Sequence, residues 1–334
     1  MMSATGALPE ASVGGRTLHH SADARPSRLR RVPVVPARRS EVSARAIVEA
    51  PSHLGLRAAG VEALPEALLA AGLAERLGAR HATRLAIPAF DPTIDAGTGL
   101  LNPHGLRDHA TRLADAVGTV LDEGAFPIVL GGDCTILLGI TLALRRRGRF
   151  GLLFLDGHAD FYQPEAEPMG EAASMELALV TGRGPDLVTD LEGRRPLLRD
   201  EDVVVFGFRD ADHAAAEGSQ PLAPTIHAID LPSVRERGAE RAARDALAHL
   251  ERTGGPAGFW VHLDVDVLDD AIMPAVDHHL PDGLTWEELT AVLRTAVASE
   301  QATGLDITIF NPTLDPDGRV ARSLVDALVA ALTP

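Results

Sequence analysis

The chain has 334 residues, of which 46% are hydrophobic, so its length allows one large domain or two ordinary ones with a sizeable core. Its formal net charge of -16 argues against a nucleic acid or an anionic membrane as a partner, because either would need a basic face. A single cysteine excludes an intrachain disulfide and fits a reducing cytoplasm, and no apolar run approaches the roughly 18 residues that span a membrane.

The first 44 residues differ in kind from the rest. They combine scattered arginines with Ser, Pro and Gly, and they show neither helical nor strand periodicity. The arginine and serine bias is typical of a transit peptide or of an arm for an acidic partner, whereas no apolar stretch suits a secretory signal. We expect a disordered tail over residues 1–44 and one folded domain over residues 45–334.

From Ala46 onward, short apolar runs alternate with helical patterns, which predicts a parallel α/β sheet of about eight strands. The expected strands are Ala46–Glu49, Arg84–Ile87, Pro127–Leu130, Leu152–Leu155, Val203–Phe208, Thr225–Ile229, Phe259–Leu263 and Leu305–Ile309.

Helical spacing of apolar residues is clear between Leu106 and Leu121, and again after Thr285 and Glu288, which form a capping-box pattern. We expect these helices to cover the faces of the sheet. The last helical pattern, Val320 to Leu332, is apolar around much of its circumference, which predicts a helix buried against a neighbouring element or subunit.

One predicted strand ends in three candidate metal ligands. The segment Gly151–Phe161, GLLFLDGHADF, closes a buried apolar run with Asp156, His158 and Asp160, at the edge where open α/β sheets keep their chemistry. Carboxylates together with an imidazole suit Mn²⁺, Fe²⁺ or Zn²⁺ better than Ca²⁺, which prefers oxygen alone. Taken alone, the same segment is also compatible with a solvated acidic loop.

Two further strand ends repeat this pattern. In WVHLDVDVLDD, Asp264 and Asp266 are two residues apart, so their side chains leave the strand end on the same side. The strand Pro127–Leu130 runs into Gly131–Thr135, where two glycines permit a tight turn and Cys134 faces the same edge. These strand ends together supply about the number of donors that two bridged metal ions need.

The order GGD-x-[ST], D-x-H-x-D and D-x-D resembles the ureohydrolase family of arginases and agmatinases. Further segments fit that family in order, namely Ala50-Pro51, Ala59–Glu62, Gly207–Asp210, Asp306-Ile307 and Asn311-Pro312. The resemblance implies a three-layer α/β/α fold and a binuclear manganese hydrolase that releases urea from a small guanidino or amidino compound. It also implies a homo-oligomer, either a trimer or a hexamer.

The resemblance also assigns the metal ligands. One ion would be held by Cys134, Asp156, Asp160 and Asp264, and the other by Asp156, His158, Asp264 and Asp266, with Asp156 and Asp264 bridging. The family has His where this chain has Cys134, and a thiolate tolerates Zn²⁺, Ni²⁺ or Fe²⁺ better than an imidazole does. Mn²⁺ remains the first expectation. The alternative for Cys134 is a buried apolar residue beside a one-ion site.

Other departures concern proton transfer and substrate binding. Ala173 stands where the family's arginases carry a His that shuttles protons, so Glu171, His278 and His279 become the candidates for the general acid. Asp277 and the two histidines lie in a loop that lines the mouth of the family's site, although a histidine pair in a loop is often plain surface. Asp212 sits where arginases place a carboxylate toward the substrate's ammonium end; the alternative is a helix-cap aspartate.

Ile309 occupies the position of the family's Glu that pairs with the guanidinium of the substrate. An apolar side chain leaves that cation unpaired, which predicts weak activity on arginine and agmatine and a preference for a neutral or less basic amidine. An N-hydroxylated or acylated guanidine is of this kind. The competing interpretation is a local shift of the alignment, with Asp277 or Glu171 supplying the carboxylate.

Three functional hypotheses follow. The leading one is a metal-dependent amidinohydrolase of a guanidino or modified guanidino compound. The second is hydrolysis of another linear amidine or amide C–N bond, such as a formimino group, at the same metals. The third is a catalytically degenerate member that keeps the fold and the metals for assembly or regulation.

Overall fold

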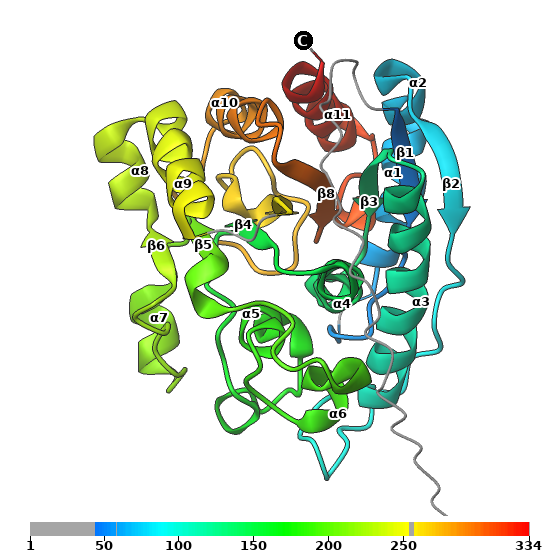
Figure 1. The fold of residues 1–334 in the computed structure, drawn as a ribbon, viewed down its shortest axis with the longest axis vertical. Helices are drawn as coiled ribbons and strands as arrows, with labels where there is room; N and C mark the ends of the chain where they lie inside the picture. Colours follow the sequence, from blue (N-terminus) through cyan, green and yellow to red (C-terminus); the bar gives the residue numbers. More distant parts are fainter. Residues whose placement is uncertain (1–43, 58, 254–256, 334) are drawn as a thin grey trace, which may run out of the picture. The chain divides into compact units, whose positions relative to one another are not determined.

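The computed structural model describes residues 44–57, 59–253 and 257–333, so the predicted tail at residues 1–44 lies almost entirely outside the described residues. An eight-stranded sheet in the order β2-β1-β3-β8-β7-β4-β5-β6 forms the centre of the described domain, and every strand pairing in it is parallel (Figure 1). The strands are β1 (Arg45–Glu49), β2 (Arg80–Arg84), β3 (Phe126–Leu130), β4 (Gly151–Leu155), β5 (Val203–Phe206), β6 (His227–Ile229), β7 (Phe259–Asp264) and β8 (Ala302–Thr308).

Helices cover both faces of the sheet. They are α1 (Leu64–Ala70), α2 (Leu73–Leu77), α3 (Pro103–Asp122), α4 (Leu137–Arg147), α5 (Glu176–Val180), α6 (Asp186–Thr189), α7 (Ala211–Ala216), α8 (Leu231–Arg237), α9 (Ala239–Thr253), α10 (Trp286–Val297) and α11 (Arg319–Leu332). One apolar cluster joins the sheet to α1, α2, α9, α10 and α11, and a second joins the opposite face to α3, α4, α5 and α6. The predicted three-layer α/β/α architecture is therefore confirmed.

The central strands are buried on both faces. Every residue of β3, β4 and β7 is buried, which explains why β3 and β4 read as uninterrupted apolar runs rather than alternating ones. In β7 the apolar run is interrupted by His262 and ends at Asp264. The predicted capping box at Thr285 and Glu288 is confirmed at the start of α10, and the apolar α11 packs against α10. Among the described helices, none is long and apolar enough to cross a membrane.

One predicted strand is wrong. The apolar residues at Arg84–Ile87 suggested a strand there, whereas β2 runs from Arg80 to Arg84 and pairs with β1 from Ala46↔Arg80 to Glu49↔Arg84. Four of its five residues are exposed because β2 is an edge strand, and an edge strand needs no apolar run. The strand predicted at Val203–Phe208 also ends earlier, at Phe206, because Gly207 turns the chain with a φ of 91°.

The sheet order explains why distant segments meet. Strands β3, β8, β7 and β4 are consecutive neighbours in space, although β4 precedes β7 by about a hundred residues in the chain. Near their carboxyl ends these strands are in register, with Leu130 beside Ile307, Ile307 beside Leu263 and Leu263 beside Leu155. The residues that follow these strands therefore lie along one edge of the sheet.

Candidate metal centre

The turn after β3 positions Cys134. A Cβ atom on Gly132 would lie 1.8 Å from the backbone oxygen of Ser52, so only glycine allows the two chain segments to approach this closely. Asp133 then fixes the turn, because its Oδ1 accepts from the Thr135 N–H at 2.9 Å and its Oδ2 accepts from the Ser52 hydroxyl at 3.0 Å. The buried Sγ of Cys134 donates to Asp264 Oδ2 at 2.7 Å, directly over the end of β7.

The segment after β4 brings three of the predicted ligands together. Asp156 is fully buried, and its Oδ1 accepts from the backbone N–H of His158 at 2.6 Å. The His158 ring holds Asp266, with 2.9 Å between Nδ1 and Oδ2. Asp266 also accepts from the Gly157 N–H at 2.9 Å, so the loops after β4 and β7 are tied to each other.

Two groups of potential ligands result. In the first, donor atoms of Asp156, His158 and Asp266 lie within 4.8 Å of one another; these are three of the four ligands expected for one ion, without Asp264. In the second, donor atoms of Cys134, Asp156, Glu176 and His262 lie within 4.8 Å of one another. Asp156 belongs to both groups, which is the arrangement a bridging carboxylate requires.

The two other predicted ligands, Asp160 and Asp264, border these groups. Asp264 receives the Cys134 thiol through Oδ2 and the Asp266 N–H at 2.8 Å through Oδ1. Asp160 lies beside Glu176 with a φ of 43°, a left-handed conformation uncommon for a residue other than glycine. All six predicted ligands are thus brought to one place at the sheet edge.

Several buried carboxyl groups give the centre a strongly negative electrostatic character. Burial, reinforced by neighbouring carboxylates, raises the pKa of Asp156 to about 6 and raises the pKa values of Asp160, Glu176 and Asp264 well above their usual range. The ionised forms are unfavourable there without positive charge, and His158 alone cannot neutralise them all. Two divalent ions would supply that charge, so the residues present fit a binuclear metal site.

Burial also raises the pKa of the Cys134 thiol well above its usual range, with the charges of Asp264 and Glu176 acting in the same direction. Burial opposes protonation of His158, but the charge of Asp266, together with the hydrogen bonds of the ring to Asp156 and Asp266, raises the pKa of the imidazole well above its ordinary value. His158 in turn lowers the pKa of Asp266 to about 2 against the effect of burial.

Sequence reasoning missed Glu176 and His262. His262 carried a usable signal, because it is two residues before Asp264 on β7 and side chains at that spacing share one face of a strand. Glu176 carried none, since it begins the short helix α5 and reaches the centre only through the packing of α5 against α4.

The predicted residues of the mouth are partly assembled. Glu171 is largely buried, and its Oε1 accepts from the Arg57 N–H at 2.7 Å while its Oε2 lies 4.0 Å from Nε2 of His278. The exposed His278 ring stands edge-on to His158, with 6.3 Å between the ring centroids. Glu171 and His278 therefore lie beside His158 of the first ligand group, whereas His279 is exposed to solvent.

The remaining predicted residues divide into two groups. Asp277 accepts from Asn311 Nδ2 at 3.1 Å through Oδ1, and Ile309 is buried in the same apolar cluster as Cys134 and Ala173. Ile309 has a φ of 69°, which strains a β-branched residue. Asp212 is exposed in the first turn of α7, and no contact in the described part of the chain joins it to the metal ligands.

Arg209 holds the wall of the site together. Its Nη2 donates to the backbone oxygens of Asp266 at 2.9 Å and Leu280 at 2.8 Å, and its Nε donates to that of Pro281 at 2.8 Å. One guanidinium thereby joins the D-x-D segment to the end of the loop that carries His278. Burial lowers the pKa of Arg209, although the nearby carboxylates oppose this shift.

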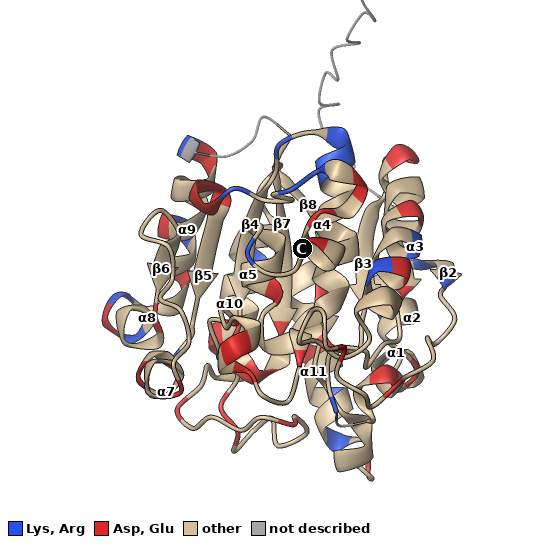
Figure 2. Ribbon diagram, turned by 90° about the horizontal axis from the view of Figure 1, so that it is seen from below, with Lys and Arg blue, Asp and Glu red and all other residues tan. Residues whose placement is uncertain are grey.

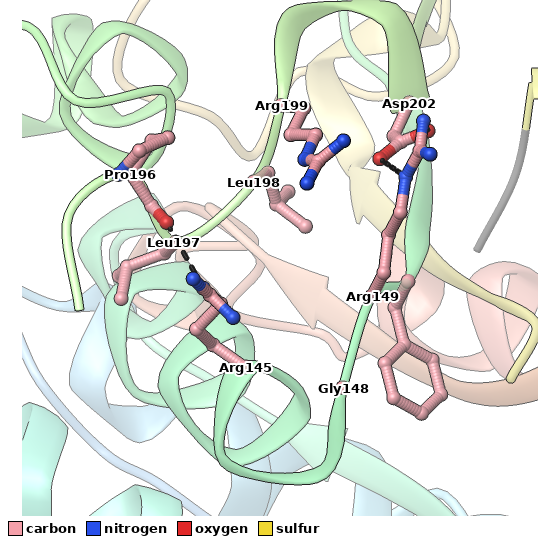
Figure 3. A pocket seen from close by; sticks show the side chains of 9 residues that line it. Arg145, Gly148, Arg149, Pro196, Leu197, Leu198, Arg199 and Asp202 are labelled. Carbon is pink, nitrogen blue, oxygen red and sulfur yellow. Dashed lines mark hydrogen bonds and ion pairs between the residues drawn. The ribbon is translucent and has the colours of Figure 1, made fainter.

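A separate pocket lies at the opposite edge of the sheet, where β4 and β5 begin (Figure 3). It is lined by Arg145, Gly148, Arg149, Phe150, Pro196, Leu197, Leu198, Arg199 and Asp202. Three consecutive arginines form the last turn of α4 beside it, and Figure 2 shows blue ribbon at the end of this helix. The pocket shares no residue with the metal ligands.

The sequence and the fold are similar to those of known arginases. The model of the arginase family matches residues 43–333. The arginase of Bacillus caldovelox is 30% identical over 296 residues, which cover 86% of this chain and 96% of that protein. The arginase of Staphylococcus aureus strain MRSA252 is 27% identical over 290 residues, covering 84% and 93%. The native structure of the Bacillus caldovelox enzyme superposes with a TM-score of 0.78 at 26% identity, covering 87% of this chain and 99% of that one.

Proposed function

The chain belongs to the arginase family, and from this we propose that it is a metal-dependent hydrolase that cleaves a C–N bond of a guanidino compound. The observation that carries the proposal is the pair of buried ligand groups that share Asp156. A carboxylate shared by both groups would let two ions lie close together, as the chemistry of two-metal hydrolases requires. Arginases are the relatives that match over most of both chains, which supports the guanidino class of substrate.

Two divalent ions at this place would lower the pKa of water and so supply a nucleophile at neutral pH. Asp156 would serve both ions, His158 and Asp266 would hold one, and Cys134 would hold the other, with Asp264 beside it. Mn²⁺ is the ion proposed from family membership, while the sulfur of Cys134 admits Zn²⁺, Ni²⁺ or Fe²⁺.

Glu171 and His278 are the residues proposed for proton transfer. Ala173 offers no titratable group, whereas Glu171 and His278 lie 4.0 Å apart beside His158. A carboxyl and an imidazole at this spacing, with the imidazole open to solvent, can carry a proton between bulk water and a departing amine. We assign general acid catalysis to this pair.

The substrate proposal rests on Ile309. Its side chain is buried and apolar, so this position offers no carboxylate to a guanidinium cation. A cation held there would lack a partner, which disfavours its binding by several kcal/mol. We therefore propose that the group cleaved is neutral or weakly basic, such as an N-hydroxylated or acylated guanidine.

A panel of substrates tests the proposal. Arginine, agmatine, guanidinobutyrate and their N-hydroxy and acyl derivatives would be assayed for urea after loading with Mn²⁺, Zn²⁺, Ni²⁺ or Fe²⁺ in turn, with Asp264→Asn as the inactive control. Turnover of the modified compounds alone is the expected result. A kcat/KM of about 10⁴ M⁻¹s⁻¹ or more on an unmodified guanidinium would refute the substrate proposal.

Two other outcomes would change the proposed function. Turnover of a formimino or amide compound without urea would favour the second hypothesis, and retained metal without turnover of any compound would favour a degenerate member. Family membership also leads us to propose a homo-oligomer, a trimer or a hexamer, which light scattering would measure directly.

A further inference from the structure

His262 is the unexpected polar residue in the core of the sheet. It lies within β7, its side chain is inaccessible to solvent, and its ring stacks on Phe154 with 4.7 Å between centroids. Nδ1 lies 2.7 Å from Asp306 Oδ2 on the neighbouring β8, and the other oxygen of Asp306 accepts from the Trp260 indole at 2.6 Å. A carboxylate accepts from this nitrogen, so when the imidazole is neutral its proton stands on Nδ1 and its lone pair on Nε2.

That lone pair has no hydrogen-bond partner among the described residues. The same is true of both carboxylate oxygens of Glu176, which is also inaccessible to solvent, and of Oδ2 of Asp156. Buried polar atoms left unpaired in this way are rare in folded proteins. Four of them converge here with the Cys134 sulfur beside them, which is the arrangement of donor atoms that a bound cation requires.

We propose that Glu176 and His262 complete a four-ligand site with Cys134 and Asp156, and that this site selects a thiophilic ion such as Zn²⁺. Sulfur and imidazole ligands favour Zn²⁺ over Mn²⁺, whereas the neighbouring group of Asp156, His158 and Asp266 contains only one nitrogen beside its oxygens. The two positions then differ in preference, with a tightly held thiophilic ion at Cys134 and a more exchangeable ion at His158. This inference rests on the proposed metal dependence, but its test identifies ligands rather than activity.

The surroundings of His262 support a ligand role. A carboxylate that accepts from the far nitrogen of a metal-binding imidazole fixes its tautomer and orientation, and Asp306 stands in that position. The thiol of Cys134 must lose its proton on binding, and its contact with Asp264 gives that proton a route to a carboxylate. Glu176 and His262 are therefore additional to the ligands that the family resemblance implies.

Wild-type protein provides the first test. After loading with one equivalent of Zn²⁺, X-ray absorption at the zinc edge should show one sulfur at about 2.3 Å and nitrogen or oxygen ligands at about 2.0–2.2 Å. Loading with Co²⁺ instead should give a near-ultraviolet thiolate-to-cobalt absorption band. A zinc spectrum with oxygen and nitrogen ligands alone would overturn the proposal, even if two ions bind and the enzyme is active.

Variants provide the second test. Glu176→Gln and His262→Gln should each weaken Zn²⁺ binding by about 100-fold or more, and Asp306→Asn by about 10–100-fold, as measured by competition with a chromophoric chelator. The matched controls are Glu167→Gln, a half-buried glutamate in the same segment, and His109→Gln, a buried histidine in α3, which should leave the affinity unchanged. Circular dichroism would establish that each variant is folded.

The outcomes separate this inference from the proposed function. Unchanged Zn²⁺ affinity in folded Glu176→Gln and His262→Gln proteins, with two ions still bound, would overturn the four-ligand site and leave the hydrolase proposal standing. Failure of the wild-type protein to bind any divalent ion would overturn both.

Discussion

Removal of the Arg149 guanidinium should destabilise the protein strongly, because it leaves a buried carboxylate without its partner (Figure 3). The side chain of Asp202 is only 1% exposed, and Arg149 grips both of its oxygens, with Nε 2.6 Å from Oδ2 and Nη2 2.7 Å from Oδ1. Arg149 lies just before β4 and Asp202 lies just before β5. This two-bond ion pair therefore joins two neighbouring strands where they begin.

The size of the effect follows from the burial of the two partners. Breaking a fully buried ion pair by deleting one partner costs about 3–5 kcal/mol. Arg149 is 34% exposed, so water screens part of the interaction and the expected loss for Arg149→Met is roughly 2–3 kcal/mol. Methionine keeps most of the apolar stem, so this loss reports the guanidinium rather than packing.

Urea denaturation followed by circular dichroism would measure the loss. Arg145→Met is the matched control in the same pocket. Among the described residues its one hydrogen bond runs from Nε to the backbone oxygen of Pro196 at 3.2 Å, so its loss should cost less than about 1 kcal/mol. Adding Asp202→Asn to Arg149→Met should recover part of the stability, since the unpaired charge is removed. A loss below about 0.5 kcal/mol for Arg149→Met would refute the reasoning.

Three further changes probe other parts of the molecule. Burial lowers the pKa of His109 to about 4, although the charge of Asp133 opposes this shift. Because the unfolded state then binds more protons, the contribution of His109 to the free energy of unfolding falls by roughly 3 kcal/mol as the pH drops from about 6.5 to about 4. His109→Leu should remove that slope from urea titrations at several pH values, whereas His104→Leu, an exposed position on the same helix, should not. Gly132→Ala should lower the midpoint of thermal unfolding by an amount equivalent to about 3 kcal/mol or more, because the added Cβ would lie 1.8 Å from the backbone oxygen of Ser52. Gly97→Ala is the control, since its Cβ would lie 3.4 Å from the nearest atom. Ile309→Glu should raise kcat/KM for agmatine by about 100-fold, and no change in steady-state kinetics would show that this wall does not face the guanidinium.

The fold and much of the centre were predictable because the signals were local. Apolar runs that end in Asp156 and Asp264 mark buried strands and their carboxyl ends, and parallel strands bring such ends to one edge. The edge strand β2 was misplaced for the opposite reason, since exposed strands carry little apolar pattern. Glu176 was beyond prediction because its position depends on how α5 packs, a contact that no spacing in the chain records.

His262 belongs to a set of residues in the sheet core that depend on one another. Its ring and the Trp260 indole share the two oxygens of Asp306, which lies opposite His262 in the β7–β8 register. Trp260 itself fits only because Gly304 faces it across the strands: a Cβ there would lie 2.1 Å from the indole ring. A buried carboxylate and imidazole would cost several kcal/mol if they served packing alone, since apolar residues of similar volume fill a core as well or better. The arrangement is explained if it orients Nε2 toward the metal centre, and Gly304→Ala should then weaken Zn²⁺ binding although residue 304 touches no ligand. Wild-type affinity in a folded Gly304→Ala protein would show that the Trp260–Asp306–His262 chain has no such role.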